Sequence, residues 1–343
     1  MVRQGSHISF VQHPSRRTLI AFTAGSLAAA FAGPLTSGAA AKVKVAAVYV
    51  APVEQQWNSR LHKALRAAQE RGDIEYAYSE SVAMTDQERV IREYATAGHQ
   101  LIVSDSFSNE EGFRVMARDY PDTKFLMASS FGPEGNNYAV FDNFIQDASY
   151  LTGLIAGGIT KSGVIGMVGG YPIPEVNRLM NAFKAGALET KPDARFLVTF
   201  IGSWFDPPKA KEAAFAQIDA GADVLYAERF GVTDAAKERK VLAIGNVINT
   251  QPDYPDTMVA SAIWNTEPMI DAAIAKVRDG AFTGESYEDY ASLKAGGAEL
   301  APLGTFEGKL PVDLMALVRK REEEIRSGAF KVQRDDSEVK PSL

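Results

Sequence analysis

The sequence predicts an α/β fold made of two similar lobes, each built on a parallel sheet. After residue 41, apolar runs of strand length alternate with helical patterns. Such alternation is typical of parallel sheets joined by right-handed crossovers. A segment of the first half, 98–107, also recurs without gaps as 221–230. This repeat indicates two related lobes, although two buried strands can also resemble each other by chance.

Composition excludes several classes of protein. The chain has 343 residues, enough for two domains, and a formal net charge of -7, which gives no sign of nucleic-acid binding. It has no cysteine, so disulfides, thiolate metal sites, cysteine nucleophiles and lipid attachment through cysteine are all excluded.

The first forty residues have the features of an export signal. The pair Arg16-Arg17 precedes an apolar run, 21–32, and small residues at 39–41 precede Lys42. This order predicts a signal peptide over 1–41 of the twin-arginine type, and a soluble, periplasmic mature chain that is not a lipoprotein. An organelle-targeting leader is the alternative, because acidic residues are absent from this stretch.

The elements of the first half follow from periodicity. The run 44–50 is continuously apolar, as expected of a strand covered on both faces. A helical stripe begins at Trp57 and stops at Gly72, and a capping box at 85–88 opens a second helix. The further strands predicted here are 74–79, 100–106, 124–129 and 138–143, with helices reaching residue 116 and covering 145–160.

The second half repeats the alternation. The strands predicted are 163–169, 196–201, 224–227, 241–245, 258–264, 287–293 and 299–303. The helices predicted are 174–188, one ending near 218, a short one after 227, 268–277 and 312–326. Gly328 ends the last helix, and the polar residues that follow predict a frayed tail over 331–343.

The internal repeat also pairs individual side chains. Asp105 and Glu228 each stand at the end of an apolar strand, and Phe107 and Phe230 follow two residues later. If the two lobes face each other at these strand ends, both carboxylates and both aromatic rings line a cleft between them.

Trp204 is the first candidate ligand contact. It follows the strand 196–201, at the point where helix-like sequence resumes. Ligands of open α/β sheets bind outside the carboxyl ends of the strands. We therefore expect Trp204 to form one wall of a ligand slot, with packing beneath a loop as the alternative.

The usual catalytic and metal-binding motifs are missing from the sequence. After residue 41 there are two histidines, His62 and His99, without paired ligand spacing, so no metal site and no cofactor are expected. No nucleophile elbow is present. Acid–base chemistry by Asp105 and Glu228 remains open, but no catalytic set surrounds them.

Several segments together resemble a known family over essentially the whole mature chain. These are 57–58, 160–170, 183–187, 202–206, 221–224 and 243–246. In this order they resemble the basic membrane protein family, periplasmic solute-binding proteins related to purine nucleoside-binding lipoproteins of ABC importers. The resemblance implies a type I periplasmic binding protein fold with a cleft between the lobes.

The resemblance also implies where the lobes divide. In that fold the chain crosses between lobes three times, expected near Asn143, Val259 and Ala295. The expected first lobe is 42–143 with 259–295, and the expected second lobe is 144–258 with 296–330.

By its resemblance to this family, the protein is expected to hold a purine between two aromatic rings, Trp57 and Trp204, one from each lobe. The expected ligand-binding residues are Trp57, Asn58, Asp105, Phe107, Trp204, Glu228, Asn246 and Trp264. Either carboxylate could accept hydrogen bonds from the base edge. Expected partners are this ligand and an ABC permease of the inner membrane, with the chain itself a monomer.

Two departures from the family pattern concern the part of the binding site that holds ribose in nucleoside-binding members. Asn246 stands where nucleoside-binding members have an acidic residue, and Trp264 stands where they have a lysine. Both changes make this part smaller and less charged, which favours a free base, adenine or a close relative. The alternatives are a nucleoside receptor, an extracytoplasmic sensor or chemoreceptor module and, least favoured, a purine-metabolising enzyme.

Overall fold

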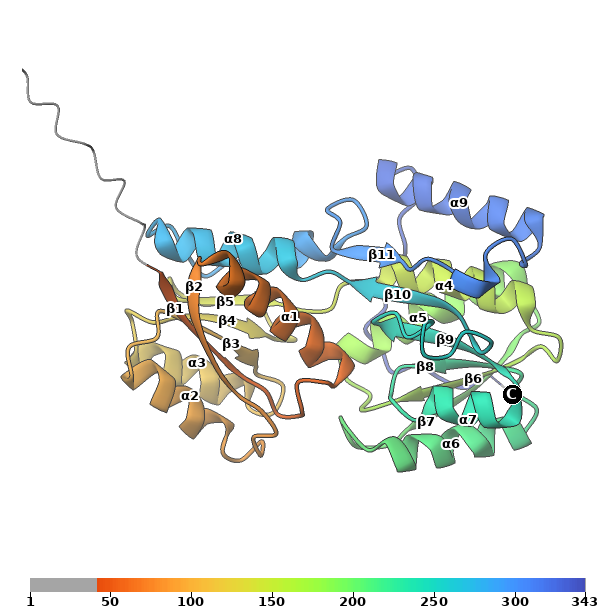
Figure 1. Cartoon of the computed structure of the whole chain (residues 1–343), viewed down its shortest axis with the longest axis horizontal. Helices are drawn as coiled ribbons and strands as arrows, with labels where there is room; N and C mark the ends of the chain where they lie inside the picture. The colour runs from red at the N-terminus through yellow and green to blue at the C-terminus, as the bar shows by residue number, and fades with distance from the viewer. Residues whose placement is uncertain (1–41, 343) are drawn as a thin grey trace, which may run out of the picture. The chain divides into compact units, whose positions relative to one another are not determined.

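The computed structural model describes residues 42–342, so the leader expected at 1–41 lies outside the described residues. Two sheets form within them, as Figure 1 shows. The first has the strand order β2-β1-β3-β4-β5 and the second β11-β10-β9-β8-β6-β7. Neighbouring strands run parallel, except that β11 runs antiparallel to β10. The predicted α/β class with two parallel-sheet lobes is confirmed.

The elements belong to the two sheets as follows. The first sheet contains β1 (Val43–Val48), β2 (Ile74–Ser79), β3 (Leu101–Asp105), β4 (Lys124–Ala128) and β5 (Tyr138–Phe141), with α1 (Gln56–Arg71), α2 (Gln87–Thr96), α3 (Glu110–Asp119) and α8 (Glu267–Arg278) around it. The second contains β6 (Val164–Gly169), β7 (Arg195–Phe200), β8 (Val224–Ala227), β9 (Leu242–Val247), β10 (Met258–Trp264) and β11 (Ala298–Leu300), with α4 (Gln146–Ile159), α5 (Pro174–Thr190), α6 (Pro207–Asp219), α7 (Val232–Arg239) and α9 (Val312–Ser327).

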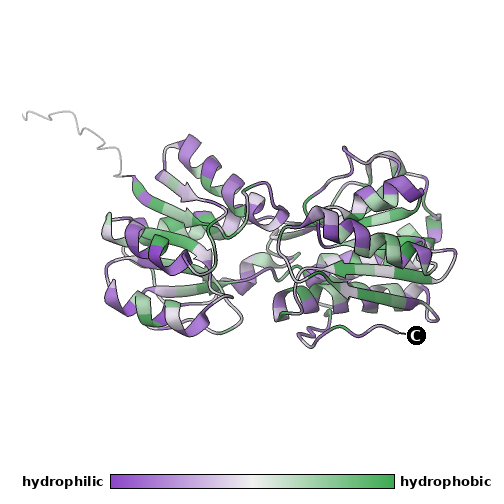
Figure 2. Ribbon diagram, turned by 90° about the horizontal axis from the view of Figure 1, so that it is seen from below, coloured by the Kyte–Doolittle hydropathy of each residue, from purple (hydrophilic) through white to green (hydrophobic). Residues whose placement is uncertain are grey.

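Helices cover both faces of each sheet, which explains the continuous apolar strands. On β1, Val45 and Ala47 pack towards α1 and α8, whereas Ala46 and Val48 pack towards α2 and α3. In Figure 2 the strands are mostly hydrophobic and the helices carry much of the hydrophilic colour. Period-2 alternation is therefore absent from these strands because neither face meets water.

The second sheet is covered by α4 and α5 on one face and by α6 and α7 on the other. The backbones of α4 and α5 approach so closely that a Cβ on Gly153 would lie 2.1 Å from the carbonyl oxygen of Phe183. A Cβ on Gly186 would lie equally close, 2.1 Å, to the carbonyl oxygen of Tyr150. These glycines let the two helices pack backbone to backbone.

The internal repeat corresponds to equivalent places in the two sheets. β3 lies next to β1, the strand that begins the first sheet, and β8 lies next to β6, the strand that begins the second. β2 and β7 flank β1 and β6 on the other side. In both sheets the strand order therefore reverses at the leading strand, and ligands of open α/β sheets bind at such a reversal.

The second crossing between the sheets lies later in the chain than expected. β10 pairs with β9 as far as Ile263, and α8 packs against α1 and β1. The chain therefore leaves the second sheet after Trp264 rather than near Val259. The strand continues because the apolar run up to Trp264 stays buried on both faces.

Two further expectations were wrong. The segment 287–293 is not a strand but contains a 3-10 helix, η1 (Glu288–Ala291), in which Ala291 is buried, and Tyr287 is buried just before it. The tail after Gly328 is not frayed over the described residues. Val332 and Val339 are buried, and Ser342 pairs with Phe196 at the edge strand β7.

Candidate ligand-binding site

A pocket of about 410 Å³ lies at the carboxyl ends of strands from both sheets. Its lining residues are Val50, Ala51, Gln55, Trp57, Asn58, Asp105, Phe107, Glu175, Trp204 and Arg229. They follow β1 and β3 in the first sheet and β6, β7 and β8 in the second, which are the strands around the two order reversals.

Trp57 reaches the pocket from the first turn of α1. The side-chain oxygen of Gln55 caps this helix by accepting from the backbone N–H groups of Trp57 (2.9 Å) and Asn58 (3.0 Å). The Asn58 amide in turn donates to the carbonyl oxygens of Ala51 (3.0 Å) and Pro52 (3.1 Å). These hydrogen bonds connect the loop after β1 to α1 and fix the backbone from which the half-buried Trp57 indole projects.

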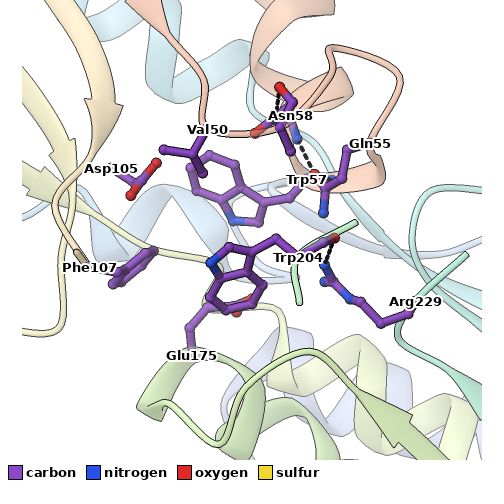
Figure 3. Close-up of a pocket in the computed structure, with 10 residues that line it drawn as sticks. Val50, Gln55, Trp57, Asn58, Asp105, Phe107, Glu175, Trp204 and Arg229 are labelled. Atoms are coloured by element: carbon purple, nitrogen blue, oxygen red, sulfur yellow. Dashed lines mark hydrogen bonds between the residues drawn. The ribbon is translucent and has the colours of Figure 1, made fainter. Parts of the chain in front are cut away.

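Trp204 reaches the pocket from the loop between β7 and α6. Its ring packs against Tyr171 at 4.8 Å between centroids, and Gly170 lies so close that a Cβ there would be 2.9 Å from the indole. Arg229 donates to the Trp204 carbonyl oxygen at 2.8 Å and lies 5.4 Å from the ring centroid. Figure 3 shows both indoles, Trp57 and Trp204, at the pocket.

Asp105 and Phe107 lie where the sequence predicted, at the end of β3 and on the pocket wall. The Gln87 side chain donates to the Asp105 carbonyl oxygen at 2.8 Å and so fixes this strand end. Burial raises the pKa of the Asp105 carboxyl group to about 6, against the lowering effect of a hydrogen bond from Gln87. Its oxygens can accept hydrogen bonds from a ligand N–H.

Glu228 does not line this pocket. Its carboxylate binds the guanidinium of Arg229 with both oxygens and accepts from the Gly170 N–H at 2.9 Å. Both side chains of this pair are buried. Glu228 therefore fixes the side chain of Arg229, which does line the pocket. Glu228 and Asp105 occupy equivalent strand ends in the internal repeat, but their side chains make different contacts.

Trp264 and Asn246 also lie outside the pocket wall. Trp264 is 1% exposed and packs behind Trp57, with 5.3 Å between the ring centroids. Asn246 lines a second cavity of about 230 Å³, where both polar atoms of its buried side chain lack a hydrogen-bond partner among the described residues. Arg229 borders both cavities.

Glu175 is the pocket residue that sequence reasoning missed. It stands in the first turn of α5, directly after Pro174, where a carboxylate is ordinary. Here it is 5% exposed and its Oε1 accepts from the Asn143 amide at 3.2 Å. Burial, reinforced by the nearby Asp142 carboxylate, raises the pKa of Glu175 to about 8. Its contact with Asn143 and its burial at the pocket are decided by tertiary packing, which no local pattern reveals.

Residues 42–342 contain no cluster of histidine, aspartate and glutamate side chains that could hold a metal ion. They also contain no helix with both the length and the apolar character needed to cross a bilayer.

Comparison with known proteins places this site in a family. Residues 42–316 match the family described as ABC transporter substrate-binding protein, PnrA-like. The chain belongs to this family. Its members bind small molecules for ABC transporters and are not enzymes, so the enzymatic alternative is excluded at the level of the family.

Individual relatives agree with this assignment. A purine-binding protein of Brucella abortus is 32% identical over 310 residues, covering 88% of this chain and 86% of that protein. A nucleoside-binding protein of an ABC transporter in Lactococcus lactis is 25% identical, covering 66% of this chain and 70% of that protein. The structure of a solute-binding protein from Conexibacter woesei matches with a TM-score of 0.67 and 25% identity, covering 86% of this chain and all (100%) of that one.

Proposed function

We propose that this chain binds a purine base, adenine or a close relative, between the indoles of Trp57 and Trp204, and delivers it to an ABC permease. The observation that carries the proposal is the pair of tryptophans, one from each half of the fold, at one pocket. A flat heterocycle can stack on both faces, and each such contact is worth about 1–3 kcal/mol in nucleic-acid complexes.

The polar groups of the pocket suit the edge of a base. Asp105 offers carboxylate oxygens to a ring N–H or an exocyclic amino group. Arg229 has N–H groups beyond those that bind Glu228 and Trp204, so it offers donors to a ring nitrogen or a carbonyl. Together they provide both acceptors and donors to the ligand edge.

The walls of the pocket favour a base over a nucleoside. Trp264 fills the space behind Trp57, and the cavity at Asn246 lies beyond Arg229. A nucleoside is the second candidate, because that adjoining cavity contains the unpartnered Asn246 amide, which could bind ribose hydroxyls.

Binding is proposed to proceed by closure of the two lobes around the ligand. One contact joins the two halves of the fold beside the second cavity: Gln56 on α1 donates to the carbonyl oxygen of Asn246 on β9 at 3.1 Å. Export by the twin-arginine leader, a periplasmic location and a monomeric state belong to the same proposal. A sensor or chemoreceptor module would use the same closure, with a different partner.

Calorimetric titration of the purified mature chain tests the ligand. We expect adenine to bind more tightly than adenosine, and glucose not to bind. Guanine, hypoxanthine and their nucleosides complete the series. Tighter binding of adenosine than of adenine contradicts the free-base assignment, and binding of glucose without any purine contradicts the purine assignment. Mass analysis of ligand released by denaturing freshly purified protein provides an independent identification.

A further inference from the structure

The carboxyl group of Glu175 has one bound and one free oxygen. Oε1 accepts from the Asn143 amide, and no hydrogen bond from residues 42–342 reaches Oε2. The residue lines the pocket together with Trp204, and Figure 3 draws both. The free oxygen is therefore available to a ligand that lies between the two tryptophans.

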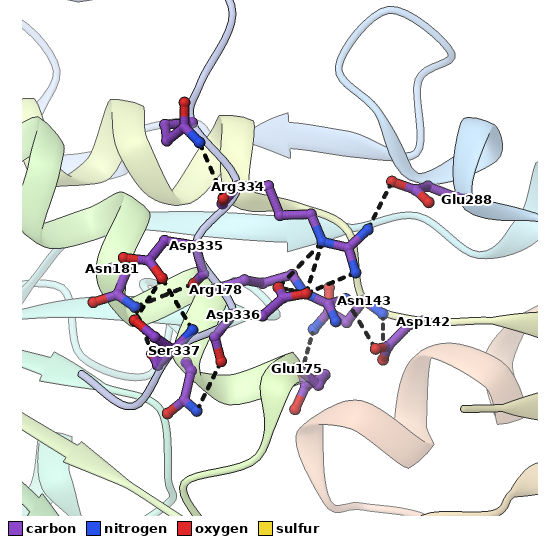
Figure 4. A network of polar contacts seen from close by, with 12 residues as sticks. Asp142, Asn143, Glu175, Arg178, Asn181, Glu288, Arg334, Asp335, Asp336 and Ser337 are labelled. Carbon is purple, nitrogen blue, oxygen red and sulfur yellow. Dashed lines mark hydrogen bonds and ion pairs between the residues drawn. The ribbon is translucent and has the colours of Figure 1, made fainter. Parts of the chain in front are cut away.

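The two arginines that favour ionisation of Glu175 among the described residues, Arg178 and Arg229, are both bound by other carboxylates. Arg178 is bound by Asp142 at 2.9 Å and by Asp336 at 3.1 Å. Arg229 is bound by both oxygens of Glu228. Figure 4 shows Arg178 engaged in the network beside Glu175 and Asn143. An ionised Glu175 would add a buried charge to carboxylates that already occupy both arginines, which is costly.

We propose that Glu175 is a specificity residue that is held as a neutral carboxylic acid and donates a hydrogen bond from Oε2 to an acceptor atom of the ligand. Its hydrogen-bonding pattern fits this form: Oε1 accepts from Asn143, and Oε2 carries the proton. The inference rests on the proposed function and identifies the ligand class more closely.

The ligand must then be a neutral heterocycle with a hydrogen-bond donor on one edge and a hydrogen-bond acceptor on another. It presents an N–H group to Asp105 and a ring nitrogen or carbonyl oxygen to Glu175. A ligand with a negative charge on the Glu175 side would meet the carboxylates around it and is rejected. Adenine, with N–H donors and unprotonated ring nitrogens, satisfies both edges.

The surroundings of Glu175 also explain its protonation. The titratable and charged groups around it are Asp105 at the end of β3, Asp142 after β5, Arg178 on α5, Glu228 and Arg229 after β8, and Asp336 in the tail. Burial and the Asp142 carboxylate raise the pKa of Glu175 to about 8. Ligand binding through the protonated form must therefore take up a proton where the free protein has lost it.

The test is calorimetric titration of the mature chain with adenine from pH 6 to pH 9, in buffers of different ionisation enthalpy. We expect proton uptake near pH 8 and an affinity that falls by up to about tenfold per pH unit above it. Glu175→Gln replaces the carboxyl group with an amide, which keeps an N–H donor but cannot ionise. It should weaken binding about two- to tenfold at pH 6 and remove the fall in affinity and the proton uptake near pH 8, whereas any effect of Asp105, whose pKa burial raises to about 6, remains in both proteins.

Two controls separate the possible outcomes. Glu212→Gln, an exposed carboxylate on α6, should behave as the unmodified chain does. Ionisation of adenine itself appears equally in all variants and cancels. Purine binding without proton uptake, or with the same pH dependence in Glu175→Gln, overturns this inference alone. A chain that binds no purine even at pH 6 overturns the proposed function, and this inference with it.

Discussion

Trp204 and Trp264 show how differently two tryptophans of one chain are used. Trp204 is half-buried, is held by Tyr171 and Arg229, and presents its indole to the pocket. Trp264 is fully buried and supports Trp57 from behind. Aromatic residues after a strand are consistent with a ligand contact such as Trp204. The local sequence alone does not distinguish this role from packing behind another ring, as at Trp264.

The stacking role of Trp204 is testable by replacement. Trp204→Ala should lower the affinity for a purine by about tenfold or more, because one stacking face worth about 1–3 kcal/mol is lost. Trp204→Phe is the matched control and should retain most of the affinity. An unchanged affinity with a lowered melting temperature in Trp204→Ala would show that this residue only packs beneath its loop.

Glu175 should also make folding stability depend on pH. Its pKa is raised by burial to about 8, whereas in the unfolded chain it is that of an ordinary carboxyl group. Between the two values the folded protein holds a proton that the unfolded chain has released. The free energy of unfolding contributed by this group is therefore complete at low pH and is lost as pH rises towards 8, by up to about 1.4 kcal/mol per pH unit.

Glu175→Gln removes this dependence. Urea unfolding of both proteins at pH 5, 6, 7 and 8 should show the variant gaining stability relative to the unmodified chain as pH rises. Glu212→Gln, at an exposed position, should show no such trend. A constant difference between Glu175→Gln and the unmodified chain over this range would mean that Glu175 is ionised in the fold.

At the scale of elements, the C-terminal segment 329–342 is a structural part of the second lobe. The Asn181 amide of α5 donates to the carbonyl oxygens of Asp335 (3.1 Å) and Ser337 (2.8 Å), and Asp336 binds Arg178. Arg334 also binds Glu288 of η1 at 3.2 Å. The segment thus joins α5 to η1, as Figure 4 shows.

Removing this segment should destabilise the protein. A chain that ends at residue 332 loses the Asp336 partner of Arg178 and exposes part of the edge of β7. We expect a loss of several kcal/mol in urea unfolding, because the buried Val339, the hydrogen bonds from Asn181 and the Asp336 partner of Arg178 are lost together. Asp336→Asn, which keeps the segment, should lose less. Equal stability of the shortened and full chains would show that the segment contributes nothing to folding.

At the scale of the whole described chain, the pocket is lined by residues that follow strands of both sheets, so the proposed closure would be linked to ligand binding. The hydrogen bond from Gln56 to the Asn246 carbonyl oxygen joins α1 to β9. Small-angle scattering of the mature chain should show a smaller radius of gyration when adenine is added. An unchanged radius at saturating adenine would contradict closure.

Gln56→Ala tests the contribution of this contact. The variant should bind adenine about two- to tenfold more weakly, because a hydrogen bond that contributes about 0.5–1.5 kcal/mol is lost from the closed form. Gln69→Ala, on the same helix but distant from the pocket lining, is the control. Equal affinities of Gln56→Ala and the unmodified chain would show that the contact does not favour closure.

Much of this fold could be predicted from the sequence. Continuous apolar strands alternating with amphipathic helices predicted two parallel sheets, because a strand covered on both faces has no polar positions. The repeat of 98–107 in 221–230 predicted the equivalence of β3 and β8. The positions of Asp105, Phe107 and Trp204 followed, because each lies at or just beyond the end of a strand, and strand ends are readable locally. Trp57, on the first turn of α1, was expected only from the resemblance to the family.

Only the tertiary structure decided the rest. It paired Glu228 with Arg229, placed Trp264 behind Trp57, brought Glu175 into the pocket and docked the tail on α5. These outcomes depend on which side chains from distant elements meet, and on which charges find partners there. Local periodicity determines whether a residue is buried, but the neighbours that set its charge and its contacts come from elsewhere in the chain.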